Sequence, residues 1–193
     1  MSKQTTKNVR EKTVAAAMSL AAAEGWETVT LHAIAAQAKL SLAVLREHFD
    51  DKTDILAAYG RGVDRRVLEQ TASAGDDTSP PRDRLFDVLM ERFEILNEDR
   101  NAVCAILRSF RCDPKQAVIG LPHLGRSMVW MLEAAQIETG GIKGALRVAG
   151  LTGLYLKTLW VWARDDSADL AATMAALDKN LSRAERWAAR IVP

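Results

Sequence analysis

Two short helical patterns separated by a tight turn occupy residues 31 to 49, and they constrain the fold more than any other segment. Ile34 and Ala35 mark the inner face of the first pattern, and Leu45 and Phe49 mark that of the second. Small residues at such a crossing let two helices approach closely, while larger apolar residues fill the junction behind them. The segment therefore predicts a helix–turn–helix.

Helical patterning extends over the rest of the 193 residues. Apolar residues recur three and four positions apart, no segment alternates as a strand would, and glycine and proline divide the chain into about nine helices. We predict an all-α protein with a three-helix head over residues 1 to 51. A larger helical domain over residues 52 to 193 follows, and its first helix, residues 52 to 70, connects the two.

Overall charge does not indicate a polyanionic partner, because the formal net charge is only +1. In residues 1 to 60, seven basic side chains face seven acidic ones: Lys3, Lys7, Arg10, Lys12, Lys39, Arg46 and Lys52 against Glu11, Glu24, Glu27, Glu47, Asp50, Asp51 and Asp54. Affinity for DNA rises with the number of phosphates that a protein neutralises. Contact with DNA therefore has to come from a local surface whose acidic side chains point away.

Patterns of catalytic and metal-binding residues are missing from the sequence. His32, His48 and His123 lie far apart and lack the spacing of metal ligands, so we expect no enzyme activity, no cofactor and no metal. The longest apolar run, residues 148 to 163, is shorter than the roughly 20 residues that span a membrane. The only two cysteines lie in one predicted helix, beyond disulfide reach, and we expect a cytoplasmic protein.

The last predicted helix carries a heptad-like seam. Its apolar residues step by four and three, and they are Leu170, Met174, Leu177, Leu181, Ala184, Ala188 and Ile191. Such a seam packs either on its own domain or on a second subunit. The preceding helix is apolar nearly all round, and Gly150 and Gly153 would let another helix approach closely. We therefore favour a homodimer in which the last two helices of each subunit form a four-helix bundle.

The N-terminal residues resemble, without a gap, the signature of the TetR family of transcriptional regulators. The matching positions are Thr13, Val14, Ala16, Ala17, Leu20, Gly25, Thr30, Ile34, Ala35, Ala38, Ser41, Leu45, His48, Phe49, Lys52 and Leu56. Proteins of that family are dimeric, all-helical, ligand-responsive repressors. The resemblance implies that this chain binds a palindromic operator in double-stranded DNA, and that residues 52 to 193 bind a ligand and dimerise.

The resemblance also implies roles for individual positions. Thr30, His48 and Lys52 would contact DNA phosphates, which fixes the register of a protein on DNA. The start of the second helix of the motif would face base edges. The whole implied DNA-contacting set is Thr30, Lys39, Ser41, Leu42, Ala43, Arg46, His48 and Lys52.

Three features depart from the family pattern. Lys39 stands where the family prefers a turn glycine, so a non-glycine residue has to adopt a positive φ. Leu42 and Ala43 replace glycine or small polar residues, which leaves apolar contact, for example with a thymine methyl group. Arg46 replaces an aromatic residue, usually Tyr, and can bind phosphate or guanine instead.

The larger domain is rich in methionine and aromatic side chains, which form either an ordinary core or an adaptable apolar pocket. Because the resemblance implies a ligand, we expect a pocket for a small apolar effector. Its candidate residues are Phe86, Met90, Phe93, Phe110, Met128, Met131 and Tyr155.

A second resemblance supports an alternative function. Residues 160 to 181, WVWARDDSADLAATMAALDKNL, are similar to part of the ubiquinone-biosynthesis accessory proteins of mitochondria and alphaproteobacteria. That similarity implies a TetR-like fold that binds lipid or isoprenoid and no longer binds DNA. The first hypothesis is thus a ligand-released repressor, and the second is a lipid-binding accessory protein. The charges around Arg46 distinguish the two.

Overall fold

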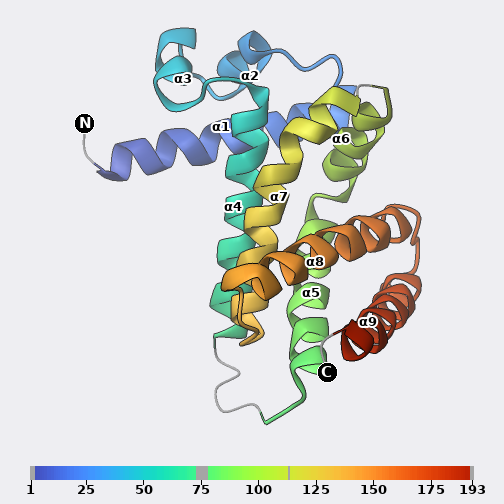
Figure 1. The fold of residues 1–193 in the computed structure, drawn as a ribbon. Coiled ribbons are helices and arrows are strands. Elements are labelled where there is room, and N and C mark those ends of the chain that lie inside the picture. The colour runs from blue at the N-terminus through green and yellow to red at the C-terminus, as the bar shows by residue number, and fades with distance from the viewer. Residues whose placement is uncertain (1–2, 73–77, 113, 192–193) are drawn as a thin grey trace. The chain divides into compact units, whose positions relative to one another are not determined.

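The computed structural model describes the backbone of residues 3–72, 78–112 and 114–191, and the side chains of 6–72, 78–111 and 118–186. Within these ranges the chain forms nine α-helices and no strand, as the sequence predicts (Figure 1). The helices are α1 (Lys3–Glu24), α2 (Leu31–Gln37), α3 (Leu42–His48), α4 (Lys52–Thr71), α5 (Pro81–Glu98), α6 (Arg100–Cys112), α7 (Pro114–Ala134), α8 (Gly141–Trp162) and α9 (Ala171–Ile191).

Packing divides the chain into two compact units along lines that differ from the predicted domains. The first unit joins residues 1–62 to residues 96–123, and the second joins residues 63–95 to residues 124–193. The difference arises because α6 packs against α1, far away in sequence. The predicted boundary after residue 51 separates a DNA-binding head from a ligand-binding domain. This division by function stays a prediction.

In the first unit, α1 is the support on which the other helices pack. It contacts α2, α3 and α6, and it is followed by Gly25, whose φ of 86° suits a glycine that comes directly after a helix. Ile34 of α2 and Leu45 of α3 are buried, as their spacing predicts, and α6 contributes Ile106 to the core. Helices of seven residues, such as α2 and α3, are marginal alone, so packing on α1 holds them in place.

In the second unit, aromatic rings join α5 to α8. The ring of Phe93 stacks on Tyr155 with centroids 5.2 Å apart, and it lies 6.4 Å from the ring of Trp162. All three side chains are almost fully buried. At the start of α8, Gly144 allows a close approach, because an added Cβ would lie 1.9 Å from the carbonyl oxygen of Thr139.

Helices α8 and α9 lie side by side (Figure 1). Buried Asn180 donates from its side-chain nitrogen to Thr158 Oγ1 across this contact at 3.1 Å. Leu170 was expected inside the last helix, but α9 begins one residue later. Leu170 itself has a φ of 53°, a left-handed conformation that is strained for a side chain of this kind.

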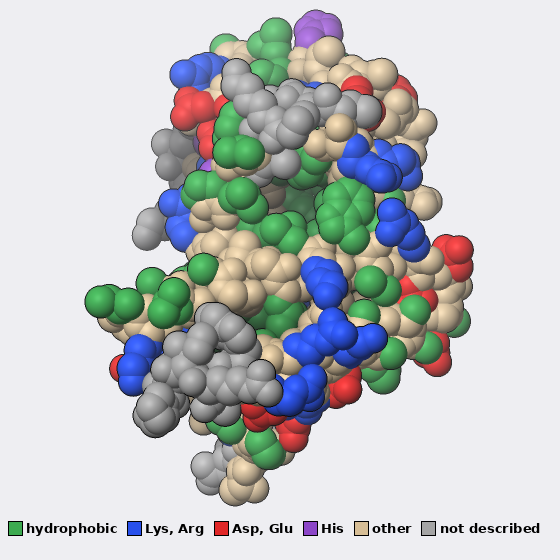
Figure 2. Space-filling view, turned by 45° about the vertical axis from the view of Figure 1, so that its right-hand side comes forward, with side chains coloured by type: hydrophobic (Ala, Val, Ile, Leu, Met, Phe, Trp, Pro, Cys, Tyr) green, Lys and Arg blue, Asp and Glu red, His purple; other side chains and the backbone are tan. Residues whose placement is uncertain are grey.

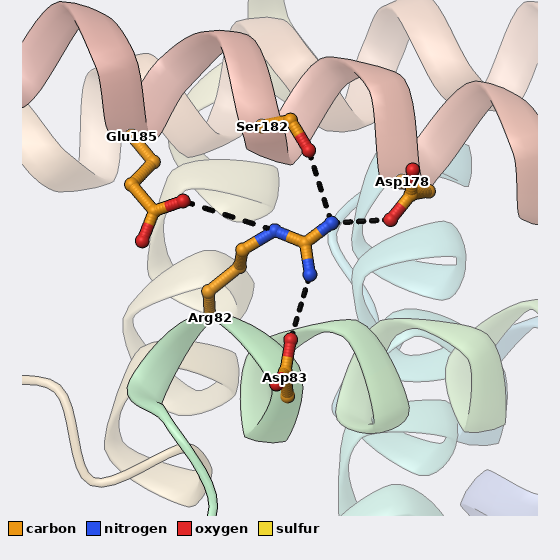
Figure 3. Close-up of polar contacts among 5 residues, drawn as sticks. All are labelled: Arg82, Asp83, Asp178, Ser182 and Glu185. Carbon is orange, nitrogen blue, oxygen red and sulfur yellow. Dashed lines mark hydrogen bonds and ion pairs between the residues drawn. The ribbon is translucent and has the colours of Figure 1, made fainter.

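A surface cluster around Arg82 ties α5 to α9 (Figure 3). Its guanidinium forms ion pairs with Asp178 and with Asp83, and it hydrogen-bonds Ser182 Oγ at 3.0 Å. Glu185 lies 4.0 Å from Arg82 Nε. Hydrogen bonds to Asp178, and then to Asp83, raise the pKa of Arg82 above its usual value. The cluster fixes α9 on the second unit through one cation.

Asp165 organises the turn between α8 and α9. Its carboxylate accepts hydrogen bonds from the amide and hydroxyl of Ser167 and from those of Thr173, the latter two both at 2.7 Å. Burial alone would raise the pKa of Asp165, but these hydrogen bonds outweigh burial and lower it from 3.8 to about 2. Asp165 therefore has a structural role in this turn.

We predict that Asp165→Asn lowers the free energy of unfolding by about 2 kcal/mol at pH 7. The folded-state pKa lies below the unfolded one, so the carboxylate stabilises the fold above pH 3.8, and this contribution disappears as the pH falls through about 2. Urea unfolding of the variant and of the wild-type protein should therefore differ less at low pH. The exposed control Glu94→Gln should behave as wild type at each pH, and a pH-independent difference for Asp165→Asn would contradict the assignment.

Candidate functional site

Two side-chain hydroxyl groups cap the N-termini of the two helices in the helix–turn–helix. Thr30 Oγ1 accepts a hydrogen bond from the amide of Ala33 at the start of α2. Ser41 Oγ accepts one from the amide of Val44 at the start of α3. Each hydroxyl satisfies an amide that the first turn of a helix leaves without a partner. Both caps are exposed, and each hydroxyl proton is still available to a DNA phosphate.

Lys39 occupies the turn in a left-handed conformation, with a φ of 57°, as its place in the sequence predicts. Its amide donates to the carbonyl of Ala36 at 3.1 Å, and the next amide, of Leu40, donates to Ala35 at 2.9 Å. This pair of hydrogen bonds is typical of a helix end that glycine normally terminates. The side chain of Lys39 is exposed.

The exposed residues of α3 are two apolar side chains, one cation and one anion: Leu42, Ala43, Arg46 and Glu47. Leu42 is 49% exposed, Ala43 is also exposed, and Leu45 points into the core. Arg46 is exposed too, and it pairs with Asp50, just beyond the helix, where both side chains remain largely accessible. Ion pairs this exposed contribute little to stability, so a phosphate can compete for the guanidinium.

Arg10 of α1 holds the end of α3, a role that the sequence did not indicate. Its Nη1 donates to the carbonyl oxygen of His48 at 3.0 Å, and its guanidinium lies 4.6 Å from the ring centroid of Phe49. The imidazole Nε2 of His48 is buried and has no hydrogen-bond partner among the described residues. Arg10 thereby orients α3 by satisfying a carbonyl at its C-terminus.

Lys52 anchors the start of α4 inside the head. Its ammonium donates to the carbonyl oxygens of Trp26 at 2.9 Å and of Val29 at 2.6 Å, and it lies 4.5 Å from the ring centroid of Trp26. Burial lowers the pKa of Lys52, and Glu27 opposes this shift. An ammonium has three protons, so one of them remains for a phosphate.

Two of the acidic side chains in this region cap α4. Asp51 Oδ1 accepts from the amide of Asp54 at 2.9 Å, and Asp54 Oδ2 accepts from the amide of Asp50 at 2.9 Å. The two hydrogen bonds place carboxylates at a helix N-terminus, where negative charge is favourable. Asp51 and Asp54 therefore have a structural reason to be there, whereas Asp50 faces Arg46 directly.

The predicted ligand-contacting residues are divided between the two units. Those of the second unit belong to its core: Phe93, Met128, Met131 and Tyr155 are almost fully buried, Met90 is 7% exposed, and Phe86 is half-buried. Phe110, also half-buried, belongs to the first unit. Their contact with a ligand stays a prediction.

A buried polar cluster lies in the second unit. Nη1 of Arg92 on α5 pairs with Asp64 on α4, and Nε donates to the hydroxyl of Tyr155 on α8 at 3.1 Å. Ser127 of α7 donates to the same oxygen of Asp64 at 2.7 Å. Burial raises the pKa of Tyr155, so it stays a neutral phenol; burial also opposes the charge of Arg92, but Tyr155 and Asp64 outweigh it and raise the pKa of Arg92.

This cluster is not among the predicted sites, although the sequence carries one signal of it. Arg92 lies three residues after Leu89 and four before Leu96, on the apolar face of α5. A charged residue at such a position is buried and has to be paired.

The predicted dimer residues fall into two groups. Gly150, Gly153, Met174 and Ala184 are exposed, whereas Leu170, Leu177 and Leu181 are buried within their own chain. The side chain of Ala188 lies outside the described residues. Two large apolar residues of α8 outside the predicted set are also exposed: Ile142 at 82% and Leu146 at 60%. Apolar side chains reach the surface at several places in the space-filling view (Figure 2).

A family model and a known repressor both match this chain. The family model described as bacterial regulatory proteins of the tetR family matches residues 14–59, which contain the whole helix–turn–helix. The HTH-type transcriptional repressor KstR of Rhodococcus jostii (strain RHA1) is 23% identical over 176 residues, covering 89% of this chain and 81% of that protein.

Solved structures show the same fold. The TetR transcriptional regulator from Nitrosomonas europaea ATCC 19718 has a TM-score of 0.72 at 28% identity, covering 92% of this chain and 98% of that one. FadR of Thermus thermophilus, a TetR-family repressor whose structure contains lauroyl-CoA, has a TM-score of 0.55 at 21% identity, covering 90% and 91%. Among the described residues, no helix is long and apolar enough to cross a membrane, and no group of three or more acidic, histidine or cysteine side chains could hold a metal ion.

We predict that Lys39→Gly raises the free energy of unfolding by about 0.5 kcal/mol, because relief of the left-handed strain exceeds the entropy that glycine loses on folding. Ala36→Gly, three residues earlier in a helix that has ordinary φ angles, should lower it by about 1 kcal/mol. Denaturant titration of both variants tests this. Equal destabilisation by both glycines would show that the turn at Lys39 carries no strain.

Proposed function

We propose that this chain, which belongs to the TetR family of transcriptional regulators, is a homodimeric repressor that a small apolar ligand releases from its operator. The observation that carries the proposal is the helix–turn–helix itself. Its second helix is capped by Ser41 and held at its end by Arg10, and its exposed residues are Leu42, Ala43, Arg46 and Glu47. The second helix of a helix–turn–helix lies in the major groove of DNA, where its exposed residues face base edges.

On DNA, the head would divide its contacts between backbone and bases. We assign Thr30, Lys39, His48 and Lys52 to phosphates, which position the protein. Because Nε2 of His48 is buried, its contact would have to come from Nδ1. Ser41 and the first turns of α3 face base edges, where Leu42 and Ala43 suit thymine methyl groups and Arg46 suits guanine or phosphate. Two heads of a dimer, about 34 Å apart, would contact successive major grooves of a palindromic operator.

The dimer is proposed to form through the exposed face of α8 and the adjoining part of α9. Ile142 and Leu146 lie on the same side of α8 as Gly150 and Gly153, and Met174 of α9 is 43% exposed. A continuous apolar and small-residue face on a helix is typical of a helix–helix interface. Leu177 and Leu181 support it from inside their own subunit.

The ligand is proposed to act through α4, the helix that begins in the head and continues into the second unit. A structure with the same fold was solved with lauroyl-CoA, so this fold accommodates acyl compounds. An apolar ligand in the second unit that shifts α4 would change the spacing of the two heads and release DNA, which is a coupling between two sites. Such a regulator acts in the cytoplasm, where the chromosome lies.

A lipid-binding protein that does not bind DNA is the second candidate. The observation that favours it is the occupation of the head's cations: Arg46 pairs with Asp50, and Lys52 donates to two carbonyl groups. The equal numbers of acidic and basic residues in the first 60 point the same way.

Binding of the purified protein to fragments of its own genome, over a salt series, tests DNA recognition. We expect selective binding to a short palindrome that weakens steeply with salt. Arg46→Ala should weaken binding and, if Arg46 contacts a phosphate, reduce the salt dependence by about one counterion. Asp50→Asn, which removes the competing carboxylate and keeps the side-chain shape, should strengthen it.

The result that contradicts the regulator is a folded dimer that binds no fragment selectively at low salt, for the wild type and for Asp50→Asn alike. The lipid-binding candidate would then stand. Selective binding that the ligand does not weaken would reject only the release step.

We predict that Leu146→Glu weakens self-association at least about tenfold, because it places a carboxylate in an apolar interface. Val118→Glu is the matched control, since Val118 is equally exposed, at 63%, but lies on α7. Sedimentation velocity of both variants over a concentration series measures the effect. Equal association of the two variants would exclude this face of α8 from the dimer.

A further inference from the structure

Arg92 is a cation in the interior of the second unit. The residue is only 5% exposed, and its guanidinium lies 5.3 Å from the ring centroid of Tyr155. A buried charge is unfavourable unless it is paired, and replacement of a buried ion pair by apolar residues is often tolerated. Beside its structural role, the buried cation of Arg92 is therefore a candidate for binding an anion.

The hydrogen-bonding capacity of Arg92 is not filled. A guanidinium has five N–H donors. Nε donates to Tyr155 and Nη1 donates to Asp64, but Nη2 donates to no acceptor among the described residues. The hydroxyl proton of Tyr155 is likewise donated to no group in the described part of the chain. Arg92 Nη2 and the hydroxyl of Tyr155 are thus neighbouring donors without an acceptor among the described residues.

Apolar side chains of the core lie in the same unit as these donors. Phe93 stacks on Tyr155, and Met128 and Met131 of α7, in the same unit, are fully buried. Methionine side chains are flexible and repack around an irregular apolar ligand. A cation with spare donors beside such side chains suits a ligand that has one anionic end and one hydrocarbon end.

We propose that Arg92 binds the carboxylate of an amphiphilic effector, a long-chain carboxylic acid whose hydrocarbon lies among Phe93, Met128 and Met131. This inference rests on the proposed function, whose effector class it specifies. A carboxylate matches the planar guanidinium with two parallel hydrogen bonds, which a neutral alcohol or ester cannot reproduce.

The charge balance gives this ligand a way to act on α4. The cluster already contains one carboxylate, Asp64, so an incoming carboxylate competes with it for Arg92. Of its partners among the described residues, Asp64 would keep the hydroxyl of Ser127 alone, and a buried charge with so few partners is unstable. Movement of this part of α4, which carries Asp64 into water, relieves that cost. The effector thereby replaces the contact that joins α4 to α5.

Isothermal titration of the purified full-length protein with sodium dodecanoate and with dodecan-1-ol, both at micromolar concentration, tests the proposal. The two probes have the same hydrocarbon and differ in charge. We expect dodecanoate to bind the wild-type protein more tightly than dodecan-1-ol does. Asp64→Asn keeps the shape of the side chain and removes the competitor, so it should strengthen dodecanoate binding by about tenfold and leave dodecan-1-ol unchanged.

Removal of the cation is the second arm. Arg92→Gln is made in the Asp64→Asn background, because the loss of both charges avoids an unpaired buried carboxylate. It should weaken dodecanoate binding by about 100-fold relative to Asp64→Asn alone. Ser127→Ala leaves the Arg92–Asp64 pair in place and should change dodecanoate affinity by less than about threefold. Circular dichroism of each variant verifies folding.

Equal affinity of the two probes, equal response of both to Asp64→Asn, or no dodecanoate binding by wild type and Asp64→Asn overturns the proposal. Operator binding is measured separately on the same preparations. Selective DNA binding without dodecanoate binding would reject the carboxylate site and keep the regulator. Dodecanoate binding that depends on Arg92, without DNA binding, would keep the site and reject the regulator.

Discussion

One buried guanidinium connects four helices of the second unit. Arg92 of α5 contacts Asp64 of α4 and Tyr155 of α8, and Ser127 of α7 completes the group through Asp64. In an interior of low polarity each of these groups depends on the others for its hydrogen bonds, so the four helices can pack in few alternative ways. The aromatic stack of Phe93, Tyr155 and Trp162 lies beside this cluster and adds apolar burial to the same joint.

In the first unit, too, cationic side chains join one helix to another. Its two seven-residue helices have little stability of their own. Long cationic side chains therefore fix them: Arg10 reaches from α1 to the end of α3, and Lys52 reaches from α4 to the segment before α2. Both also lie over aromatic rings, those of Phe49 and Trp26, where a cation is favoured. Arg10 and Lys52 thus stabilise the fold of the head, and their charges are only partly available for contact with DNA.

Local patterns predicted the elements well, because they depend on neighbours in sequence. Helices fall where their apolar spacing predicts them, and Lys39 takes the left-handed turn that the missing glycine implied. Contacts between distant segments were not predictable in this way. Nothing in the spacing of α6 showed that it packs on α1, and nothing near Arg10 showed that its partner is the carbonyl of His48. The seam on α9 was periodic as predicted, but periodicity does not distinguish an inner face from an outer one, and Leu177 and Leu181 proved to face inward.

The packing of α6 on α1 has a consequence for how such heads can be exchanged. The core of the first unit is completed by residues 96–123, which follow the helix–turn–helix by almost fifty positions. A chimera that transplants only the N-terminal segment would leave Ile106 and its neighbours on α6 facing a foreign surface. Recombination between relatives would therefore preserve a working head only when both segments come from the same parent. The part of this chain that would have to be exchanged as a unit consists of two segments that are separate in the sequence.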